Sequence, residues 1–299
     1  MKSNSSQRYR QYKQTQRKKR RNKLFSGCLT IFLKAILIAL IIIISLSVYF
    51  FIPQRTNILL LGLDYAPPNS TVARTDTIIL TTFATPPAYV GLLSIPRDLW
   101  IPIRNVGSNR INTAHFFAEA QQPGSGPYAT MQAIQDNFGI KSDYFIRLRF
   151  EGFREIVDAM GGLDIKLDKP MAGYEAGNYH LTGRKALAFA RNRRGSDDFS
   201  RMEQGQLILK SIYKQLLKPT EWPRIPAVLV ALSNSIDTNV PNWLWPRIGL
   251  ILFRVGIDNI DSRTITREMT IPTVTEQGAS VLLPKWELII PLVNDIFGN

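Results

Sequence analysis

Residues 57–64 read NILLLGLD, and this short stretch decides the fold class of the region around it. The run is apolar at nearly every position and ends at the acidic residue Asp64. A strand with one face in water alternates apolar and polar residues, whereas a nearly continuous apolar run is typical of a strand that is buried on both faces. The stretch therefore predicts a central strand covered on either side.

Strand-like and helix-like runs follow this stretch. Residues 77–83 and 89–95 are two strand candidates, and the short connection between them contains Pro86 and Pro87, which favours a hairpin over a crossover helix. The remaining runs predict strands at 144–149 and 163–167, and helices at 128–138, 150–160, 185–191, 202–217 and after Pro284. The order predicts an α/β domain with a mixed central sheet flanked by helices.

The segment before the first strand predicts a membrane anchor. Residues 35–52 form an apolar run interrupted only by Ser45 and Ser47, and residues 29–33 extend it. About 20 apolar residues span a bilayer, so residues 29–52 are expected to form a transmembrane helix. The run is too long for a signal sequence, and the bulky residues of 49–51 stand where a cleavage site needs small ones. The expected layout is a tail at 1–28, a helix at 29–52 and one domain at 53–299.

Charge is distributed unevenly along the chain. The formal net charge is +14, but residues 1–52 hold eleven Lys and Arg and no acid, which leaves 26 basic and 23 acidic residues in 53–299. Basic residues before a span favour a cytoplasmic N-terminus and an extracytoplasmic domain, as in a single-pass protein of a bacterial cell membrane. The tail is interpreted as binding anionic lipid. Nucleic acid is the alternative partner for the tail and is not expected, because no helix-turn-helix pattern is present.

Elimination narrows the chemistry of the outer domain. Cys28 is the only cysteine and lies before the span, so the domain has no disulfide and no thiol nucleophile. His115 and His180 are the only histidines, which almost excludes a zinc site made of His and Cys. Neither a G-x-S-x-G elbow nor a Walker loop occurs. Carboxylates and arginines remain as the chemical groups.

The predicted hairpin brings charged residues together. The first strand ends at Asp64, the hairpin begins beside Arg74 and Asp76, and it ends beside Arg97, so these four are expected at one rim. Carboxylates with waters and phosphate oxygens complete a Mg²⁺ site, and the planar fork of arginine binds phosphate. The rim therefore suits Mg²⁺ and a phosphorylated ligand. The alternative is a set of surface salt bridges.

A second group of arginines lies between residues 191 and 201. Arg191 and Arg193 would share one face of an extended segment, whereas Arg194 is interpreted as a solvated charge. Asp198 and Arg201 follow. Four arginines within eleven residues indicate a polyanionic ligand, because the domain as a whole is nearly neutral.

Seven strings occur in register between residues 56 and 217: NILLLGLD, RTDTIIL, LLSIPRDLWI, RINTAH, DYFIRLRFEGFREIVDAMGGLDI, LTGRKALAFARNRR and DDFSRMEQGQ. Together they resemble the LytR–CpsA–Psr family of bacterial cell-wall enzymes. The resemblance implies that family's α-β-α fold. It also implies a phosphotransferase that moves a glycopolymer, such as teichoic acid, from a polyprenyl pyrophosphate carrier to peptidoglycan through a phosphodiester.

The resemblance also assigns roles to residues. Asp64 and Asp76 match the acids that hold Mg²⁺, and Asp198 matches the acid of the D-F-x motif, which orients the arginines or assists the acceptor. Arg201 matches the arginine after that motif. The expected pyrophosphate-binding residues are Arg74, Arg97, Arg110, Arg191 and Arg193.

One departure from the family pattern concerns substrate specificity. The family usually continues R-x-x-R-Q, but here Gln204 replaces a basic residue and Gly205 replaces a glutamine, while Gln206 is expected to point elsewhere. Two other functions stay open at this level: hydrolysis of the pyrophosphate by water, and a membrane-bound regulator without turnover. The residues do not specify which glycopolymer or which acceptor hydroxyl is used, nor whether the chain self-associates.

Overall fold

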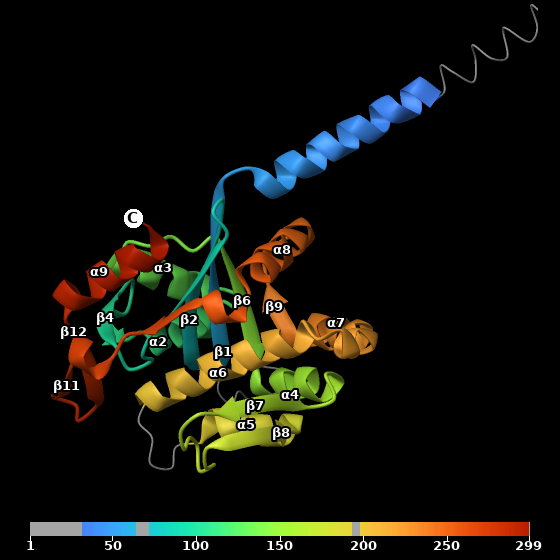
Figure 1. Ribbon diagram of the computed structural model, residues 1–299. Coiled ribbons are helices and arrows are strands. Elements are labelled where there is room, and N and C mark those ends of the chain that lie inside the picture. The colour runs from blue at the N-terminus through green and yellow to red at the C-terminus, as the bar shows by residue number, and fades with distance from the viewer. Residues whose placement is uncertain (1–31, 64–71, 193–197, 299) are drawn as a thin grey trace, which may run out of the picture. The chain divides into compact units, whose positions relative to one another are not determined.

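The computed structural model describes residues 32–63, 72–192 and 198–298 of the chain (Figure 1). It contains two compact units, residues 1–52 and 53–299, which are described separately. In the first unit, Phe32–Phe51 form one helix whose mean hydropathy of 2.6 and length of 20 residues suffice to cross a membrane. This helix falls within the span expected at 29–52. Which end faces the cytoplasm stays a prediction.

The second unit is built on a six-stranded mixed sheet in the order β10-β3-β2-β1-β6-β9. Its central strand β1 runs antiparallel to β2 and parallel to β6, while β3 is antiparallel to β2 and parallel to β10. The strands are β1 (Gln54–Leu63), β2 (Thr75–Thr85), β3 (Tyr89–Ser94), β6 (Tyr144–Arg149), β9 (Ile236–Thr238) and β10 (Asp261–Thr264). The predicted hairpin of residues 77–83 and 89–95 is β2 and β3.

Three two-stranded sheets accompany the main sheet. They are β4 (Trp100–Ile103) with β5 (Gly107–Arg110), β7 (Leu163–Leu167) with β8 (Gly177–Leu181), and β11 (Thr270–Val274) with β12 (Ser280–Pro284). The α-helices of the domain are α2 (Asn112–Gln121), α3 (Gly126–Phe138), α4 (Phe150–Ala159), α5 (Gly183–Arg191), α6 (Asp198–Leu216), α7 (Ile225–Ser235), α8 (Trp245–Val255) and α9 (Trp286–Phe297). Short 3-10 helices η1 (Pro219–Arg224), η2 (Asn242–Leu244), η3 (Ile257–Asn259) and η4 (Arg267–Met269) join them.

The main sheet is covered on both faces, as the apolar run of β1 predicts. Leu59 and Leu61 point to a core shared with α2, α3 and α9, and Ile58 points to the opposite face, where α8 packs. Side chains of a strand alternate between its faces, so the unbroken apolar run of residues 58–61 in β1 supplies both cores. The α/β fold with a mixed sheet between helices is thereby confirmed (Figure 1).

A further core lies beside the sheet, among α4, α5, α6, α7 and the β7–β8 hairpin. The predicted end of the helix at 128–138, which is α3 beside the main core, is confirmed. The backbone φ of Gly139 is +73°, which ends α3 in the left-handed conformation that glycine adopts without strain. Residues 219–246 form no linker, because β9 lies among them and completes one edge of the main sheet. The β4–β5 hairpin, α2, β8, α7, α8 and β9–β12 have no counterpart among the predicted ranges.

Candidate functional site

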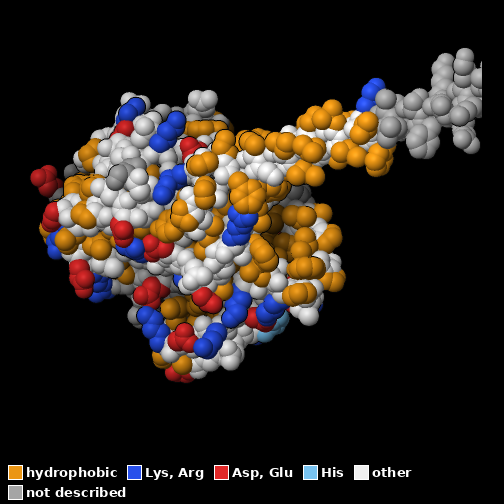
Figure 2. All heavy atoms as spheres, turned by 45° about the horizontal axis from the view of Figure 1, so that its top comes forward, with side chains coloured by type: hydrophobic (Ala, Val, Ile, Leu, Met, Phe, Trp, Pro, Cys, Tyr) orange, Lys and Arg blue, Asp and Glu red, His pale blue; other side chains and the backbone are white. Residues whose placement is uncertain are grey.

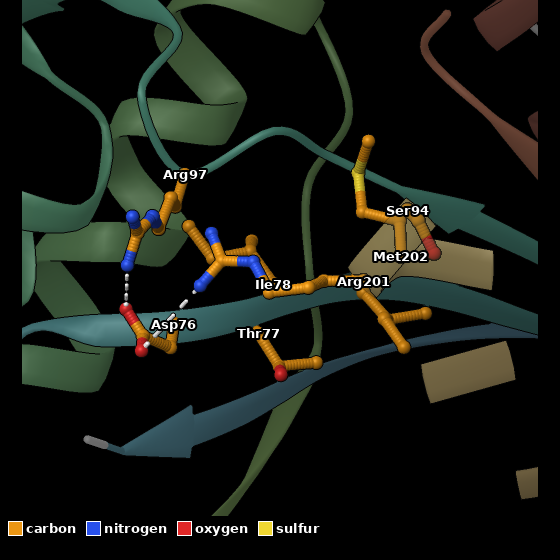
Figure 3. A pocket seen from close by; sticks show the side chains of 8 residues that line it. Asp76, Thr77, Ile78, Ser94, Arg97, Arg201 and Met202 are labelled. Carbon is orange, nitrogen blue, oxygen red and sulfur yellow. Dashed lines mark hydrogen bonds and ion pairs between the residues drawn. The ribbon is translucent and has the colours of Figure 1, made fainter. Parts of the chain in front are cut away.

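A small pocket lies where β2 begins and β3 ends (Figure 3). Asp76 is the second residue of β2, Arg97 follows β3, and Arg201 lies in the first turn of α6. These three side chains converge in Figure 3, and they line the pocket together with Thr77, Ile78, Ile79, Ser94 and Met202. Three segments far apart in the sequence thus supply the charges of one site.

Asp76 lies between two arginines. Arg97 Nη1 donates to Asp76 Oδ1 at 2.5 Å, and Arg201 Nη1 lies 3.9 Å from Asp76 Oδ2. The Asp76 and Arg201 side chains are each 12% exposed, so solvent screens their interaction only partly. Burial lowers the pKa of Arg97, but Asp76 and Asp98 raise it, and the net result is a pKa above the ordinary value. Arg97 is therefore a permanent cation at this site.

The ion pairs continue from Arg97 along one side of the pocket. Asp98 Oδ2 lies 3.4 Å from Arg97 Nε, and Asp98 Oδ1 lies 3.3 Å from Arg110 Nε. Arg110 also donates from Nη2 to the Ser280 carbonyl at 2.7 Å, which ties it to β12. Three guanidinium groups thus share two carboxylates, and the cluster has a net positive charge that suits an anion.

Of the other expected site residues, Arg74 and Arg191 are described, and both lie near this edge of the sheet. Leu63, which directly precedes Asp64, pairs with Thr75 of β2 on one side and with Arg149 of β6 on the other. Arg74 immediately precedes β2, is exposed, and lies 5.9 Å from the Phe116 ring centroid.

Arg191 reaches this edge from α5. Its guanidinium carbon lies 4.9 Å from the ring centroid of Phe150, the residue that follows β6. β1 lies between β2 and β6. Because neighbouring strands are about 4.8 Å apart, β2 and β6 are separated by about 10 Å. Asp64 and Arg193 lie outside the described residues, as does the side chain of Asp198, which begins α6. The roles of all these residues stay predictions.

The donor set can be tested for Mg²⁺. Among residues 32–63, 72–192 and 198–298, no three His, Cys, Asp or Glu side chains form a group that could hold a metal ion. Mg²⁺ needs fewer protein ligands than this, because it keeps several waters and takes one or two carboxylates together with phosphate oxygens. Asp76 fits as one such carboxylate. The second expected ligand, Asp64, lies outside the described residues.

Helix α6 contains Arg201 and also residues 204–206, where the sequence differs from the family pattern. Gln204 is fully buried, and its amide has no hydrogen-bond partner in the part of the chain that the structure describes. At Gly205, a Cβ would meet no atom within 4 Å, so the site can accept a larger side chain there. The expectation that Gln206 points elsewhere is only partly right. Its Nε2 donates to Ser94 Oγ at 3.0 Å, and Ser94 lines the pocket.

A buried polar network holds the segment just before Arg74. His115 of α2 is fully buried, and its Nδ1 lies 2.9 Å from the Ala73 carbonyl, while its Nε2 lies 3.1 Å from Arg147 Nη1. A guanidinium can only donate, so Nε2 accepts and Nδ1 carries the hydrogen that is donated to Ala73. Arg147 also pairs with Glu119 at 2.9 Å and with Asp237. Sequence reasoning missed this network, because its members come from α2, β6, β9 and the segment before β2, which lie far apart in the sequence.

The network predicts a pH-dependent stability. Burial, aided by the charge of Arg147, lowers the pKa of His115 below 6.5, so the folded chain binds a proton there at lower pH than the unfolded chain does. The free energy of unfolding should therefore fall as the pH drops below about 6.5, by up to about 1.4 kcal/mol per pH unit from this one group. Stability continues to fall until the pH reaches the lowered pKa of His115 in the folded chain.

Chemical denaturation of the full chain in detergent, between about pH 5 and 8, measures this slope. Tryptophan fluorescence reports the domain alone, because all five tryptophans lie within residues 53–299. His115→Gln keeps a donor and an acceptor but does not titrate, so its stability should lack the histidine contribution to the slope. Equal slopes for the two proteins would show that His115 does not titrate differently on folding.

The chain is similar to known proteins over most of its length. Residues 47–287 match the model of the LytR_cpsA_psr family. Regulatory protein MsrR of Staphylococcus aureus (strain COL) is 26% identical over 71% of this chain and 64% of its own length. Polyisoprenyl-teichoic acid–peptidoglycan teichoic acid transferase TagU of Bacillus cereus (strain ZK / E33L) is 30% identical over 62% of this chain and 61% of its own length. The chain thus spans somewhat less than two thirds of these relatives.

Among solved structures, TagV of B. subtilis superposes with a TM-score of 0.66 at 21% identity, over 82% of this chain and 98% of TagV. At this identity the likeness shows the fold.

Proposed function

This chain belongs to the LytR–CpsA–Psr family, and from that premise we propose that it transfers a glycopolymer from a polyprenyl pyrophosphate carrier to peptidoglycan. The observation that carries the proposal is the cluster in which Arg97 and Arg201 flank Asp76, with Arg110 joined to it through Asp98. A pyrophosphate offers several anionic oxygens to such a cluster. The relative TagU, named as a polyisoprenyl-teichoic acid–peptidoglycan teichoic acid transferase, supports teichoic acid as the glycopolymer and peptidoglycan as the acceptor.

In the proposed reaction, a sugar hydroxyl of peptidoglycan attacks the phosphorus at the end of the glycopolymer. A new P–O bond forms, the bond from that phosphorus to the bridging oxygen breaks, and the prenyl phosphate leaves with the electron pair. The hydroxyl loses its proton, and Asp198 is the candidate acceptor. The product is a phosphodiester between glycopolymer and peptidoglycan, and the reaction needs no covalent enzyme intermediate.

The arginines serve this reaction by position and charge. Arg97 is held by Asp76 and Asp98, so its guanidinium is already oriented when substrate arrives. Each charge-assisted hydrogen bond from such a fork to a phosphate oxygen contributes about 1.5–3 kcal/mol. Arg74, Arg191 and Arg193 are proposed to bind the remaining phosphate oxygens. Charge that develops on the bridging oxygen is thereby stabilised without reorganisation of the site.

Mg²⁺, when bound, would neutralise charge on the pyrophosphate, with Asp76 and Asp64 as the proposed protein ligands. Asp76 then has two tasks, since the same carboxylate orients Arg97. A lipid-linked donor also agrees with the helix Phe32–Phe51, which is long and apolar enough to keep the domain at a membrane. We propose that the domain lies on the extracytoplasmic side, as the basic N-terminal tail suggests.

The test is a transfer assay with the full chain in nanodiscs, a lipid-pyrophosphate glycan and peptidoglycan fragments. We expect glycan linked to peptidoglycan, loss of product on addition of EDTA, and recovery with Mg²⁺. Free glycan phosphate formed equally with and without acceptor would assign hydrolysis instead. Donor binding without turnover would overturn the proposal in favour of a regulator, the role that the name of the relative MsrR indicates for that protein.

A further inference from the structure

Three large aromatic side chains are exposed in the segment formed by η2 and α8. Trp243 is 54% exposed, Trp245 is 37% exposed and Phe253 is 70% exposed. We refer to these three residues as the aromatic ridge. The pocket around Asp76 is lined by residues of β2, α6 and the end of β3, so the ridge is a separate surface.

Helix α8 is apolar on its outward side as well as on its inward side. Ile248, Ile251 and Val255 are buried against the sheet, whereas the side chains of Trp245 and Phe253 are exposed to solvent. A helix on the surface of a soluble domain normally has polar residues on its outward side. Large apolar side chains exposed within one short segment mark a place where another apolar phase or partner binds.

The position of α8 in the domain identifies that partner. Arg247 in its first turn donates to the Gln54 side chain, and Gln54 is the first residue of β1. Only Ile52 and Pro53 separate Gln54 from Phe51, the last residue of the apolar helix. Three residues of extended chain reach at most about 11 Å, so the covalent link limits how far this end of the domain can lie from the end of a membrane-spanning helix.

We propose that the aromatic ridge inserts into the headgroup region of the membrane that the helix Phe32–Phe51 spans. Tryptophan favours this region, because its ring is apolar while its N–H can still meet water or a headgroup. Arg254, exposed beside Phe253, adds a positive charge that suits lipid phosphates. Figure 2 shows hydrophobic side chains gathered on the right-hand part of the domain, where Figure 1 places α7 and α8.

The lipid interaction gives the domain a second attachment besides its covalent link. A single flexible link would let the domain rotate freely above the bilayer, whereas an inserted ridge fixes one side of it against the lipid. Leu229 and Val230 of α7 are also exposed apolar residues, at 59% and 60%. This proposal holds for any reaction at the Asp76 cluster and does not rest on the proposed transferase activity.

The test uses the full chain in nanodiscs whose lipids carry bromine on the upper acyl chain, which quenches nearby tryptophan fluorescence. The apolar helix contains no tryptophan, so any quenching reports the domain. We expect clear quenching in the wild type relative to unbrominated lipid, and loss of most of it in Trp243→Phe/Trp245→Phe. The proposal is overturned if the wild type shows no quenching. It is also overturned if the three tryptophans that remain in the double variant are quenched as strongly as the wild type is.

A second pair of variants tests insertion without removing a reporter. Phe253→Asp places a charge in the ridge and should reduce quenching of Trp243 and Trp245, whereas Val274→Asp should leave it unchanged. Val274 is the matched control, because it is also an exposed apolar residue, at 65%, but belongs to β11. A different result would be protection of the ridge from aqueous acrylamide without any bromine quenching, seen only at a high ratio of protein to lipid. That result would mean that the ridge binds a second copy of the chain, and the proposal would be wrong.

Discussion

Arg97→Lys should lower the rate of glycopolymer transfer by about 10²–10³-fold, the usual loss when one preorganised donor to a developing charge is removed. Lysine keeps the positive charge but lacks the planar fork. Arg97 uses one nitrogen on Asp76 and another on Asp98, and a single ammonium group cannot hold both carboxylates in this geometry. The loss should therefore appear chiefly in kcat, since the net charge that attracts the donor is unchanged.

A matched variant separates this effect from a general effect of losing an arginine. Arg104 also forms a fork with a carboxylate, that of Asp136, at 2.6 and 2.7 Å, but it is 66% exposed and lies on another surface. Arg104→Lys should leave transfer within about twofold of wild type, because exposed pairs contribute little. If Arg97→Lys retains wild-type kcat while the chain remains folded, Arg97 does not act in the transition state.

The fold could be predicted to a large extent because its strongest signals are local. The apolar run of β1 and the proline-rich turn between β2 and β3 are contained in short windows, and both elements form as expected. The hairpin then brings Asp76 to Arg97, so part of the candidate site follows from topology alone. The family and the fold class are confirmed, whereas the assigned roles of the site residues stay predictions.

The parts that could not be predicted depend on contacts between distant segments. The β4–β5 hairpin turns at Asn105 and Gly107, which have φ values of +61° and +87°. Its strands are only four residues each, too short for a clear alternation of apolar and polar residues. Asp98 is a bridge between two arginines only because β5 folds back beside the end of β3. Likewise, no local pattern marks Arg147 as a buried cation, since its partners come from α2 and β9.

Glu119→Gln should destabilise the domain by about 3–5 kcal/mol, the cost of removing one partner from a buried ion pair. The Glu119 side chain is fully buried, and that of Arg147 is only 6% exposed. Both carboxylate oxygens are occupied, since Oε1 accepts from the Gly124 amide, while Oε2 accepts from the Gly126 amide and pairs with Arg147. A glutamine amide must turn its NH₂ toward one of these donors, and it leaves Arg147 with the half-exposed Asp237 as its remaining counterion.

Neighbouring atoms prevent the site from relaxing around the new side chain. A Cβ at residue 126 would lie 2.7 Å from Glu119 Oε2 and from the His115 ring, so only glycine allows α3 to approach this closely. The amide group of a glutamine at 119 therefore has no space to shift. Because His115 connects Arg147 to the Ala73 carbonyl, the loss should also loosen the chain next to Arg74, ahead of the Asp76 cluster.

Chemical denaturation of the full chain, followed by tryptophan fluorescence, measures the change. Glu203→Gln is the control, because Glu203 is 50% exposed, pairs with Lys169 at 2.9 Å and should contribute no more than about 1 kcal/mol. Comparable midpoints for the two variants would show that the Glu119–Arg147 pair contributes no more than a surface pair does. A large loss at Glu119 alone would mean that a buried ion pair, remote in sequence from Arg74 and Asp76, stabilises the sheet edge on which the candidate site is built.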